Sequence, residues 1–483
     1  MVTRLVRAPR IDFASLRREL ELPTQFPLAA QQEADEAAAR ASEEPSPDAA
    51  DRTDIPFVTI DPATSRDLDQ ALHLHRLERG YRISYAIADV SAFVPVGGEL
   101  QAETWRRGET VYLPDGKVPL HPVSLSEGAA SLLPDQTRRA VLWTIDIDAD
   151  GATTAVRVER AIVRSRAKLD YAGVQAGVAA GQLHEAITLL PEVGALLEAR
   201  ALDRGAINLP IPEQELDPDD GGWRLVLRAG LPAETWNAQI SLLTGMSAAA
   251  MMLRGGIGLL RTMPTPKPEA VRALTTVAAG LGLPWPDGAS VGRVLASVDP
   301  ATPRGAAFVD QAAELMRGAG YTALDGAPPA ETGHGAVGAP YAHVTAPLRR
   351  LADRYATEVC LSLFDNRDVP EWVRVALPQL PDVMGRSGRQ ASAAERGAID
   401  LAEAVLMANR VGEEFDATVL DVDGRSRPEG KDRPERPPTG TVALDEPPVR
   451  GRCEGTLRLG ERVRVRLVKA DPVRRTVLFE AMP

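Results

Sequence analysis

The sequence contains little cysteine and few aromatic residues. Its 483 residues include only two cysteines, Cys360 and Cys453, and 4% aromatic residues. Two cysteines so far apart exclude a disulfide framework and a cysteine-based zinc site, and they favour a reducing cytoplasm. Because aromatic residues are scarce while glycine (40) and proline (39) are frequent, we expect many turns and cores built from Leu, Val and Ala.

Positive charge is also in deficit. The chain has 55 Lys and Arg residues against 67 Asp and Glu residues, which gives a formal net charge of −12. This balance excludes a protein that coats nucleic acid through a uniformly basic surface. Hydrophobic residues make up 44% of the chain, which excludes wholesale disorder. The length predicts about three domains.

Long apolar runs are missing as well. The most apolar stretch, residues 238–260, is interrupted by Arg254 and by several glycines, so it predicts a buried helix and no membrane span. Arg4, Arg7 and Arg10 are not followed by an apolar segment, so we expect no secretory signal. The sequence therefore predicts a protein without membrane association.

The residue pattern changes twice along the chain and predicts an α+β fold in three parts. Residues 1–50 predict a short helical and linker segment, and residues 51–411 predict β-sheets surrounded by helices. Residues 412–483 alternate with period two in short segments, which predicts a five-stranded β-barrel of the OB type. Within this last part, the Pro-rich and charged residues 426–440 predict a mobile loop.

A cluster of carboxylates follows the first predicted strand. Asp61 ends the strand, and Asp67 and Asp69 lie two positions apart, so an extended loop directs both side chains to one side. Carboxylates are the hard oxygen ligands that Mg²⁺ and Mn²⁺ prefer, and two such ions can support phosphoryl displacement. The spacing alone is more typical of an acidic surface loop. A calcium loop is disfavoured because Leu72 occupies the sixth position, where glycine is required.

Residues 58–72 and 81–100 resemble the signature of the ribonuclease II family of 3′-to-5′ exoribonucleases, in its RNB catalytic domain. Further similar segments follow in the family's order, at residues 107–134, 164–174, 204–213, 341–354 and 393–403. The resemblance spans roughly residues 52–410, and the C-terminal barrel is similar to the family's S1 RNA-binding domain. It implies hydrolysis of single-stranded RNA to 5′-mononucleotides inside an RNA channel, with Mg²⁺ or Mn²⁺ as cofactor.

Asp61, Asp67 and Asp69 match three of the family's four active-site aspartates, which implies catalytic and metal-binding roles. Gln70 occupies the fourth position, and its amide supplies no negative charge, so we expect weaker binding of a second metal ion. The consequence ranges from a modest slowing to complete loss of activity. Asp89 is a candidate replacement acid, and the alternative is a carboxylate that holds a turn.

The resemblance also implies a set of residues that contact RNA. They are Tyr112, Tyr171, Tyr341, His343, Arg349, Arg350, Glu395 and Arg464. Tyrosines stack on bases without reading sequence. Arg349, which follows a helix start predicted at Pro347, would grip the scissile phosphate with its planar fork beside free backbone amides, and Asp353 would orient the arginine pair.

Each of these residues also has a structural interpretation. The tyrosines and His343 fit core positions, Arg349 and Arg350 fit a solvated helix face, and Glu395 fits a helix surface contact. Arg464 lies in a stripe of alternating arginines that suits either RNA phosphates or a charge-guarded edge strand.

The chain departs from the family pattern in two further places. No β-barrel precedes residue 55, so the family's paired N-terminal cold-shock domains are not expected here, and structured RNA could reach the channel more openly. No acid occurs between Thr235 and Pro268, where the family carries glutamates that contact the terminal nucleotide.

Three functions therefore remain open. The favoured one is an exoribonuclease acting on single-stranded RNA, as a cytoplasmic monomer with or without a helicase or degradation-complex partner. The second is a catalytically impaired protein that binds RNA without cleaving it, and the third is a DNA exonuclease.

Overall fold

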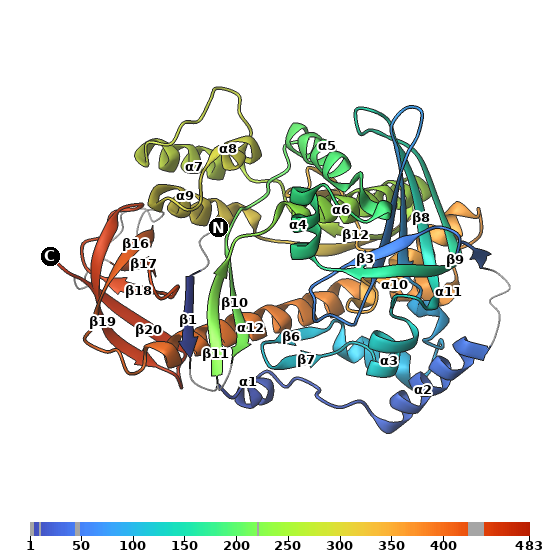
Figure 1. Ribbon diagram of the computed structural model, residues 1–483, viewed down its shortest axis with the longest axis horizontal. Helices are drawn as coiled ribbons and strands as arrows, with labels where there is room; N and C mark the ends of the chain where they lie inside the picture. The colour runs from blue at the N-terminus through green and yellow to red at the C-terminus, as the bar shows by residue number, and fades with distance from the viewer. Residues whose placement is uncertain (1–3, 9–10, 44–48, 220–221, 424–438) are drawn as a thin grey trace.

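The computed structural model describes residues 4–8, 11–43, 49–219, 222–423 and 439–483. Its largest sheet has six strands in the order β2-β9-β3-β4-β5-β8 (Figure 1). These strands are β2 (Ala50–Asp51), β3 (Phe57–Ile60), β4 (Gln70–Arg76), β5 (Tyr81–Ala88), β8 (Thr137–Ile147) and β9 (Thr153–Leu169). The long β9 pairs with β8 along its first part and with β3 at its end, so five of the strands form a closed ring of pairings.

Both faces of this sheet are covered, because the strands carry apolar residues on both sides. Leu72 and Tyr85 face one core, which contains residues of helices α5 (Leu190–Asp203), α6 (Pro232–Gly255) and α10 (Leu351–Phe364). The neighbouring Ala71 and Ala86 face a second core with α2 (Leu28–Glu43) and α3 (Glu99–Arg107). This alternation follows from the period of two along a strand.

Smaller elements surround the sheet. A three-stranded sheet has the order β1-β11-β10, and three two-stranded antiparallel sheets join β6 to β7, β12 to β13, and β14 to β15. Their bounds are β1 (Arg4–Ala8), β6 (Val111–Leu113), β7 (Gly116–Val118), β10 (Glu213–Asp219), β11 (Gly222–Arg228), β12 (Ile257–Thr262), β13 (Gly320–Asp325), β14 (Gly333–His334) and β15 (Ala339–Pro340). The remaining helices include α1 (Ala14–Glu19), α4 (Tyr171–Ala180), α7 (Pro268–Gly280), α8 (Val291–Ser297), α9 (Pro303–Ala313), α11 (Glu371–Ala376) and α12 (Leu380–Met407).

The C-terminal part is the closed five-stranded barrel that the sequence predicts. Its strands run in the order β16-β17-β18-β20-β19. They are β16 (Glu414–Val422), β17 (Thr439–Leu444), β18 (Arg450–Glu454), β19 (Arg462–Asp471) and β20 (Thr476–Ala481). Helix α12 runs from the large sheet's region to the barrel (Figure 1), and both contribute to one hydrophobic core that includes Ala398, Met407 and Phe479.

Several expectations from the sequence change in detail. The apolar residues 238–260 form the buried end of α6 and then β12, because Gly256 adopts a left-handed conformation that ends the helix. Residues 4–8 form β1, a strand that exists only through its pairing with β11. Most of the predicted loop at 426–440 lies outside the described residues. None of the described helices carries an apolar stretch long enough to cross a bilayer.

Candidate active site

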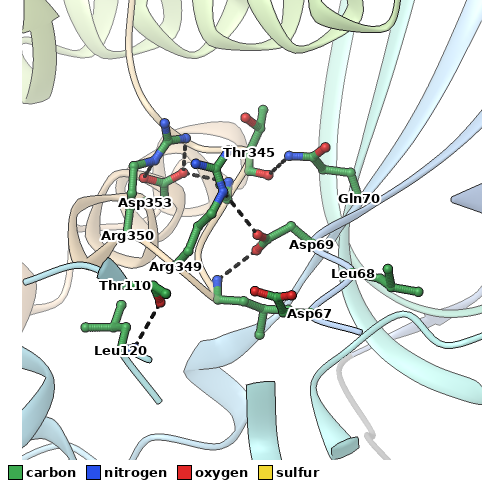
Figure 2. A network of polar contacts seen from close by, with 12 residues as sticks. Asp67, Leu68, Asp69, Gln70, Thr110, Leu120, Thr345, Arg349, Arg350 and Asp353 are labelled. Carbon is green, nitrogen blue, oxygen red and sulfur yellow. Dashed lines mark hydrogen bonds and ion pairs between the residues drawn. The ribbon is translucent and has the colours of Figure 1, made fainter. Parts of the chain in front are cut away.

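The three predicted carboxylates are placed by β3 and by the loop that leads into β4. The backbone amide of Asp61 donates to Leu169 O at 3.1 Å, which continues the pairing of β3 with β9. Ser131 holds the loop from behind, because its hydroxyl accepts from Leu68 N at 3.0 Å and donates to Arg66 O at 2.7 Å. Asp67 and Asp69 consequently face the same region, as Figure 2 shows.

Burial dominates the electrostatics of this cluster. Burial raises the pKa of Asp69 to about 8. Burial and the negative charge of Asp67 together raise the pKa of Asp61 to about 6. Arg349 lowers both pKa values and Lys168 lowers that of Asp61, but burial outweighs these positive charges. The cluster is therefore an environment that a divalent cation would stabilise.

Asp69 contacts the loop that carries Arg349. Its Oδ1 accepts from the backbone amide of Leu348 at 2.8 Å, and its Oδ2 lies 3.7 Å from Arg349 Nε (Figure 2). The Arg349 side chain is still 44% exposed, so it can reach an anion at the surface of the cluster. The structure thus brings together two residues that are 280 positions apart in the chain.

The neighbouring Arg350 is held differently. It is partly buried and donates to both carboxylate oxygens of the fully buried Asp353, at 3.0 and 2.9 Å. Asp353 Oδ1 also accepts from the backbone amide of Ala346 at 2.7 Å. Asp353 therefore orients Arg350 and the loop, and it makes no hydrogen bond to Arg349 in the described structure.

The prediction that a helix starts at Pro347 is wrong, because α10 begins at Leu351. Residues 347–349 form a turn, and the amides of Ala346 and Leu348 are already used by Asp353 and Asp69. These amides are therefore not free to bind phosphate, contrary to the expectation from the sequence.

Two residues that sequence reasoning missed support the Arg349 loop. The backbone amide of Thr110 donates to Arg349 O at 2.9 Å. The buried His121 has its Nδ1 at 3.1 Å from Leu348 O. Burial lowers the pKa of His121 to about 4, so the ring is neutral near pH 7 and Nδ1 carries the donated proton. A histidine among apolar neighbours gave no signal of this role in the sequence.

Gln70 does not face the cluster as a ligand. Its Nε2 donates to Thr345 O at 2.5 Å (Figure 2). Asp89, the candidate replacement acid, instead forms an ion pair with Arg160 at 3.0 Å. Arg160 also contacts Glu358. Asp89 is therefore a structural carboxylate, and it acts through an ion pair where the sequence suggested a turn.

Asp67 has two partners from the β6–β7 hairpin. Lys117 Nζ lies 3.0 Å from Asp67 Oδ1 and 2.9 Å from Glu127 Oε1, and the Tyr112 hydroxyl donates to Asp67 Oδ2 at 3.0 Å. Tyr112 is 48% exposed, so its ring is available for stacking beside the cluster. Lys117 was not predicted, because only the hairpin brings it to the aspartates.

Tyr171 lies at the first turn of α4. Asp170 caps this helix by accepting from Gly173 N at 2.8 Å, which fixes the position of the tyrosine. The Tyr171 hydroxyl accepts from Asn237 Nδ2 at 3.2 Å. Burial and the charge of Asp61 raise the pKa of Tyr171, so the hydroxyl stays neutral beside the carboxylates.

Tyr341 and His343 belong to an aromatic cluster. His343 Nδ1 lies 2.7 Å from the Tyr321 hydroxyl, and the rings of Tyr341 and His343 pack edge to face at 5.5 Å. Tyr341 is buried, and burial lowers the pKa of His343 well below its ordinary value. Both side chains pack within this aromatic cluster, which matches the interpretation of these positions as core positions.

Glu395 and Arg464 are not brought into the carboxylate cluster. Glu395 is exposed and lines a groove of about 960 Å³ between α12, β10 and the barrel. Arg464 forms ion pairs with Glu414 at 3.6 Å and Asp416 at 3.1 Å, so its charge is compensated. The edge-strand interpretation is wrong, because β19 pairs with strands on both sides.

The donor set fits a hard divalent cation, although the side chains are not gathered around one point. Among the described residues, no three His, Cys, Asp or Glu side chains stand close enough to hold a metal ion. Asp61, Asp67 and Asp69 nevertheless offer oxygen ligands of the kind that Mg²⁺ prefers, and burial raises the pKa of Asp61 and of Asp69, so a divalent cation would stabilise their charged forms.

Comparison with known proteins relates this geometry to a family. Residues 50–362 match the RNB domain, and residues 413–482 match the RNase II-type exonuclease C-terminal S1 domain. The chain is 29% identical to exosome complex exonuclease RRP44 homolog A of Arabidopsis thaliana, over 71% of this chain and 38% of that protein. It is 26% identical to ribonuclease R 1 of Lactococcus lactis, over 85% of this chain and 52% of that protein. The chain thus spans about half the length of these relatives or less.

Solved structures show the same fold. The apo form of Mycoplasma genitalium RNase R matches with a TM-score of 0.82 and 20% identity, over 97% of this chain and 77% of that one. Yeast Ssd1, a pseudonuclease, matches with a TM-score of 0.68 and 16% identity, over 92% of this chain and 54% of that one. The chain belongs to the RNB-domain family and carries an RNase II-type C-terminal S1 domain.

Proposed function

We propose that this protein is a 3′-to-5′ exoribonuclease that hydrolyses single-stranded RNA to 5′-mononucleotides. The observation that carries the proposal is the position of Arg349 at 3.7 Å from the buried Asp69, near the half-buried carboxylates Asp61 and Asp67. A partly buried group of acids next to an exposed arginine suits a reaction at a phosphodiester, because the acids attract cations and the arginine attracts the phosphate.

Asp61, Asp67 and Asp69 would hold Mg²⁺ or Mn²⁺. Bound there, a divalent cation would activate the attacking water and neutralise charge on the phosphate. Arg349 would contact the phosphate oxygens and stabilise the charge that develops on them. Its backbone oxygen accepts from Thr110 N at 2.9 Å, which fixes the position from which the side chain extends.

The two tyrosines would hold the terminal nucleotides. Tyr112 presents an exposed ring beside Asp67, and Tyr171 lies near Asp61. Stacking on aromatic rings is tolerant of sequence, which suits an enzyme that degrades any RNA. We do not assign RNA contacts to Tyr341 and His343, because packing satisfies both side chains.

A second candidate function is RNA binding without cleavage. Gln70 stands where the family has an acid, and its amide is committed to Thr345 O, so it adds no charge to the cluster. The fold match to Ssd1, a pseudonuclease, shows that the same architecture exists in a protein described as inactive. A protein of this kind would retain the fold and the RNA contacts and would not hydrolyse the phosphodiester bond.

The deciding experiment uses a 5′-labelled single-stranded RNA with Mg²⁺, with Mn²⁺ and with EDTA, alongside a DNA oligomer of the same sequence. Asp69→Asn is the matched inactive variant, because asparagine keeps the Oδ1 acceptor for Leu348 N while it removes the charge. A descending ladder on RNA that disappears with EDTA and with Asp69→Asn supports the exoribonuclease. Bound but intact RNA that only a Gln70→Asp variant cleaves supports the second candidate.

A further inference from the structure

A second cavity lies away from the carboxylate cluster, between α5, α6, the tip of the β8–β9 hairpin and β15. Its volume is about 450 Å³. One wall is a stripe along α6, where Gln239, Leu243 and Met246 follow each other at helical spacing. A cavity of this size with apolar walls is typical of sites for small molecules.

Three arginines line this cavity, and no acid does. Arg200 and Arg204 come from the C-terminal end of α5 and the residue that caps it, and Arg254 comes from the last turn of α6. In a chain with 67 acids and 55 bases, a cavity lined by three arginines and no carboxylate is a local reversal of the overall charge. Such a cavity attracts anions.

The three guanidinium groups have no carboxylate partner among the described residues. Arg200 donates only to the backbone oxygen of Asp150 at 3.0 Å. Asp203, the acid next to Arg204 in sequence, is paired with Arg293 at 2.6 Å. The acid adjacent to Arg204 is therefore used elsewhere.

Arg204 carries the clearest sign of a missing partner. Its Nε is buried and makes no hydrogen bond. Burial, together with the positive charge of Arg200, lowers the pKa of Arg204. A buried donor without an acceptor costs free energy, and a bound anion would supply the acceptor.

The shape and chemistry of the cavity restrict the ligand. Guanidinium groups match phosphate oxygens through pairs of parallel hydrogen bonds. Inorganic phosphate alone would leave most of about 450 Å³ unfilled and would not contact the apolar wall of Leu243, Met246 and Leu253. A phosphate attached to an apolar or planar group fits both halves of the cavity.

We propose that this cavity is a binding site for a nucleoside monophosphate, with the phosphate held by Arg200, Arg204 and Arg254 and the nucleoside placed against α6. The site is separate from the carboxylate cluster, and it does not depend on exonuclease activity.

The test is isothermal titration calorimetry of the full chain in EDTA, with AMP, adenosine and inorganic phosphate as separate ligands. We expect AMP to bind, and adenosine and inorganic phosphate to bind at least about tenfold more weakly, because each lacks one half of the ligand. Arg204→Gln should weaken AMP binding by about tenfold or more, and Arg272→Gln on the exposed face of α7 should leave it unchanged. Asp69→Asn should also leave it unchanged.

Three results would overturn the proposal. AMP could bind with equal affinity to the wild type and to Arg204→Gln, or inorganic phosphate could bind as tightly as AMP. Loss of AMP binding in Asp69→Asn would assign the affinity to the carboxylate cluster instead. Arg254→Gln provides an independent variant, because Arg254 is exposed at a helix end and its replacement leaves the core intact.

Discussion

Gln70 Nε2 and Thr345 O are joined by a hydrogen bond across 275 positions of the chain. The bond links the start of β4 to the loop that carries Arg349. It requires a donor at position 70, because its partner is a carbonyl oxygen. A carboxylate cannot donate, so the amide at this position has a structural function that the family's acid could not perform.

We therefore expect Gln70→Asp to destabilise the fold by about 1–3 kcal/mol, which is the usual cost of leaving a buried partner unsatisfied. Urea unfolding monitored by circular dichroism would measure the change. Gln70→Asn is the matched control, because it keeps the amide and shortens only the stem. Equal stability of the wild type and Gln70→Asp would show that the bond contributes nothing.

The sequence predicted some of this site and missed the rest for a physical reason. The convergence of Asp67 and Asp69 follows from local geometry, so the period of an extended chain was enough to predict it. The contacts of Lys117 and His121 depend on how distant loops pack, which no local pattern encodes. The contacts of these two residues can be recognised only in the structure, where the segments that carry them lie beside the aspartates and the Arg349 loop.

The fold, like the site, was predicted where a local residue pattern determines the element and missed where the element depends on distant residues. The period of two predicted the barrel. Strand β1 was missed because its pairing partner lies more than 200 residues away. The domain boundary near residue 411 stays a prediction, because α12 and the barrel share one hydrophobic core across it.

His121→Phe should slow RNA cleavage by about tenfold or more, since small displacements of a catalytic group reduce rates strongly. Phenylalanine fills the buried space but cannot donate to Leu348 O, so the backbone beside Arg349 loses one support. Steady-state kinetics should show a lower kcat with a smaller change in KM. His184→Phe, at a helix cap elsewhere, is the control. An unchanged kcat in His121→Phe would remove the histidine from the positioning of Arg349.

Lys117→Met should increase the affinity for a divalent cation, on the order of tenfold, because the ammonium group competes with the metal for Asp67. Binding of Mn²⁺, followed by electron paramagnetic resonance, measures this without any cleavage assay. Lys267→Met, at an exposed residue before α7, controls for the loss of one positive charge. Weaker Mn²⁺ binding in Lys117→Met would mean that the lysine supports the site and does not compete with the metal.

Arg464→Ala should have little effect on RNA binding, because Glu414 and Asp416 already neutralise this arginine. We expect the affinity for RNA to fall by less than about threefold. The slope of the logarithm of the binding constant against the logarithm of the salt concentration should change by less than about one, which corresponds to one released counterion. Fluorescence anisotropy with labelled RNA at several salt concentrations measures both quantities. A decrease as large as that of Arg349→Ala would place RNA on this face of the barrel.

Glu403 makes the junction between α12 and the barrel sensitive to pH. Its buried Oε1 accepts from Arg450 N at 2.7 Å and from Gln214 Nε2 at 2.8 Å, and burial raises the pKa of Glu403 to about 7. An acid with a raised pKa in the folded state binds its proton more tightly there than in the unfolded state. This group therefore reduces the stability of the fold as pH rises from about 4.5 to 7.

Glu403→Gln should remove this loss of stability. Glutamine keeps the Oε1 acceptor for Arg450 N and Gln214 Nε2, and it carries no charge at any pH. We expect the variant to gain stability over the wild type at pH 8, by up to on the order of 3 kcal/mol, and to gain almost nothing at pH 4.5. Thermal unfolding of both proteins between pH 4.5 and 8 measures the difference. A difference that stays constant across this range would show that Glu403 keeps an ordinary pKa in the folded protein, and that the junction tolerates its charge.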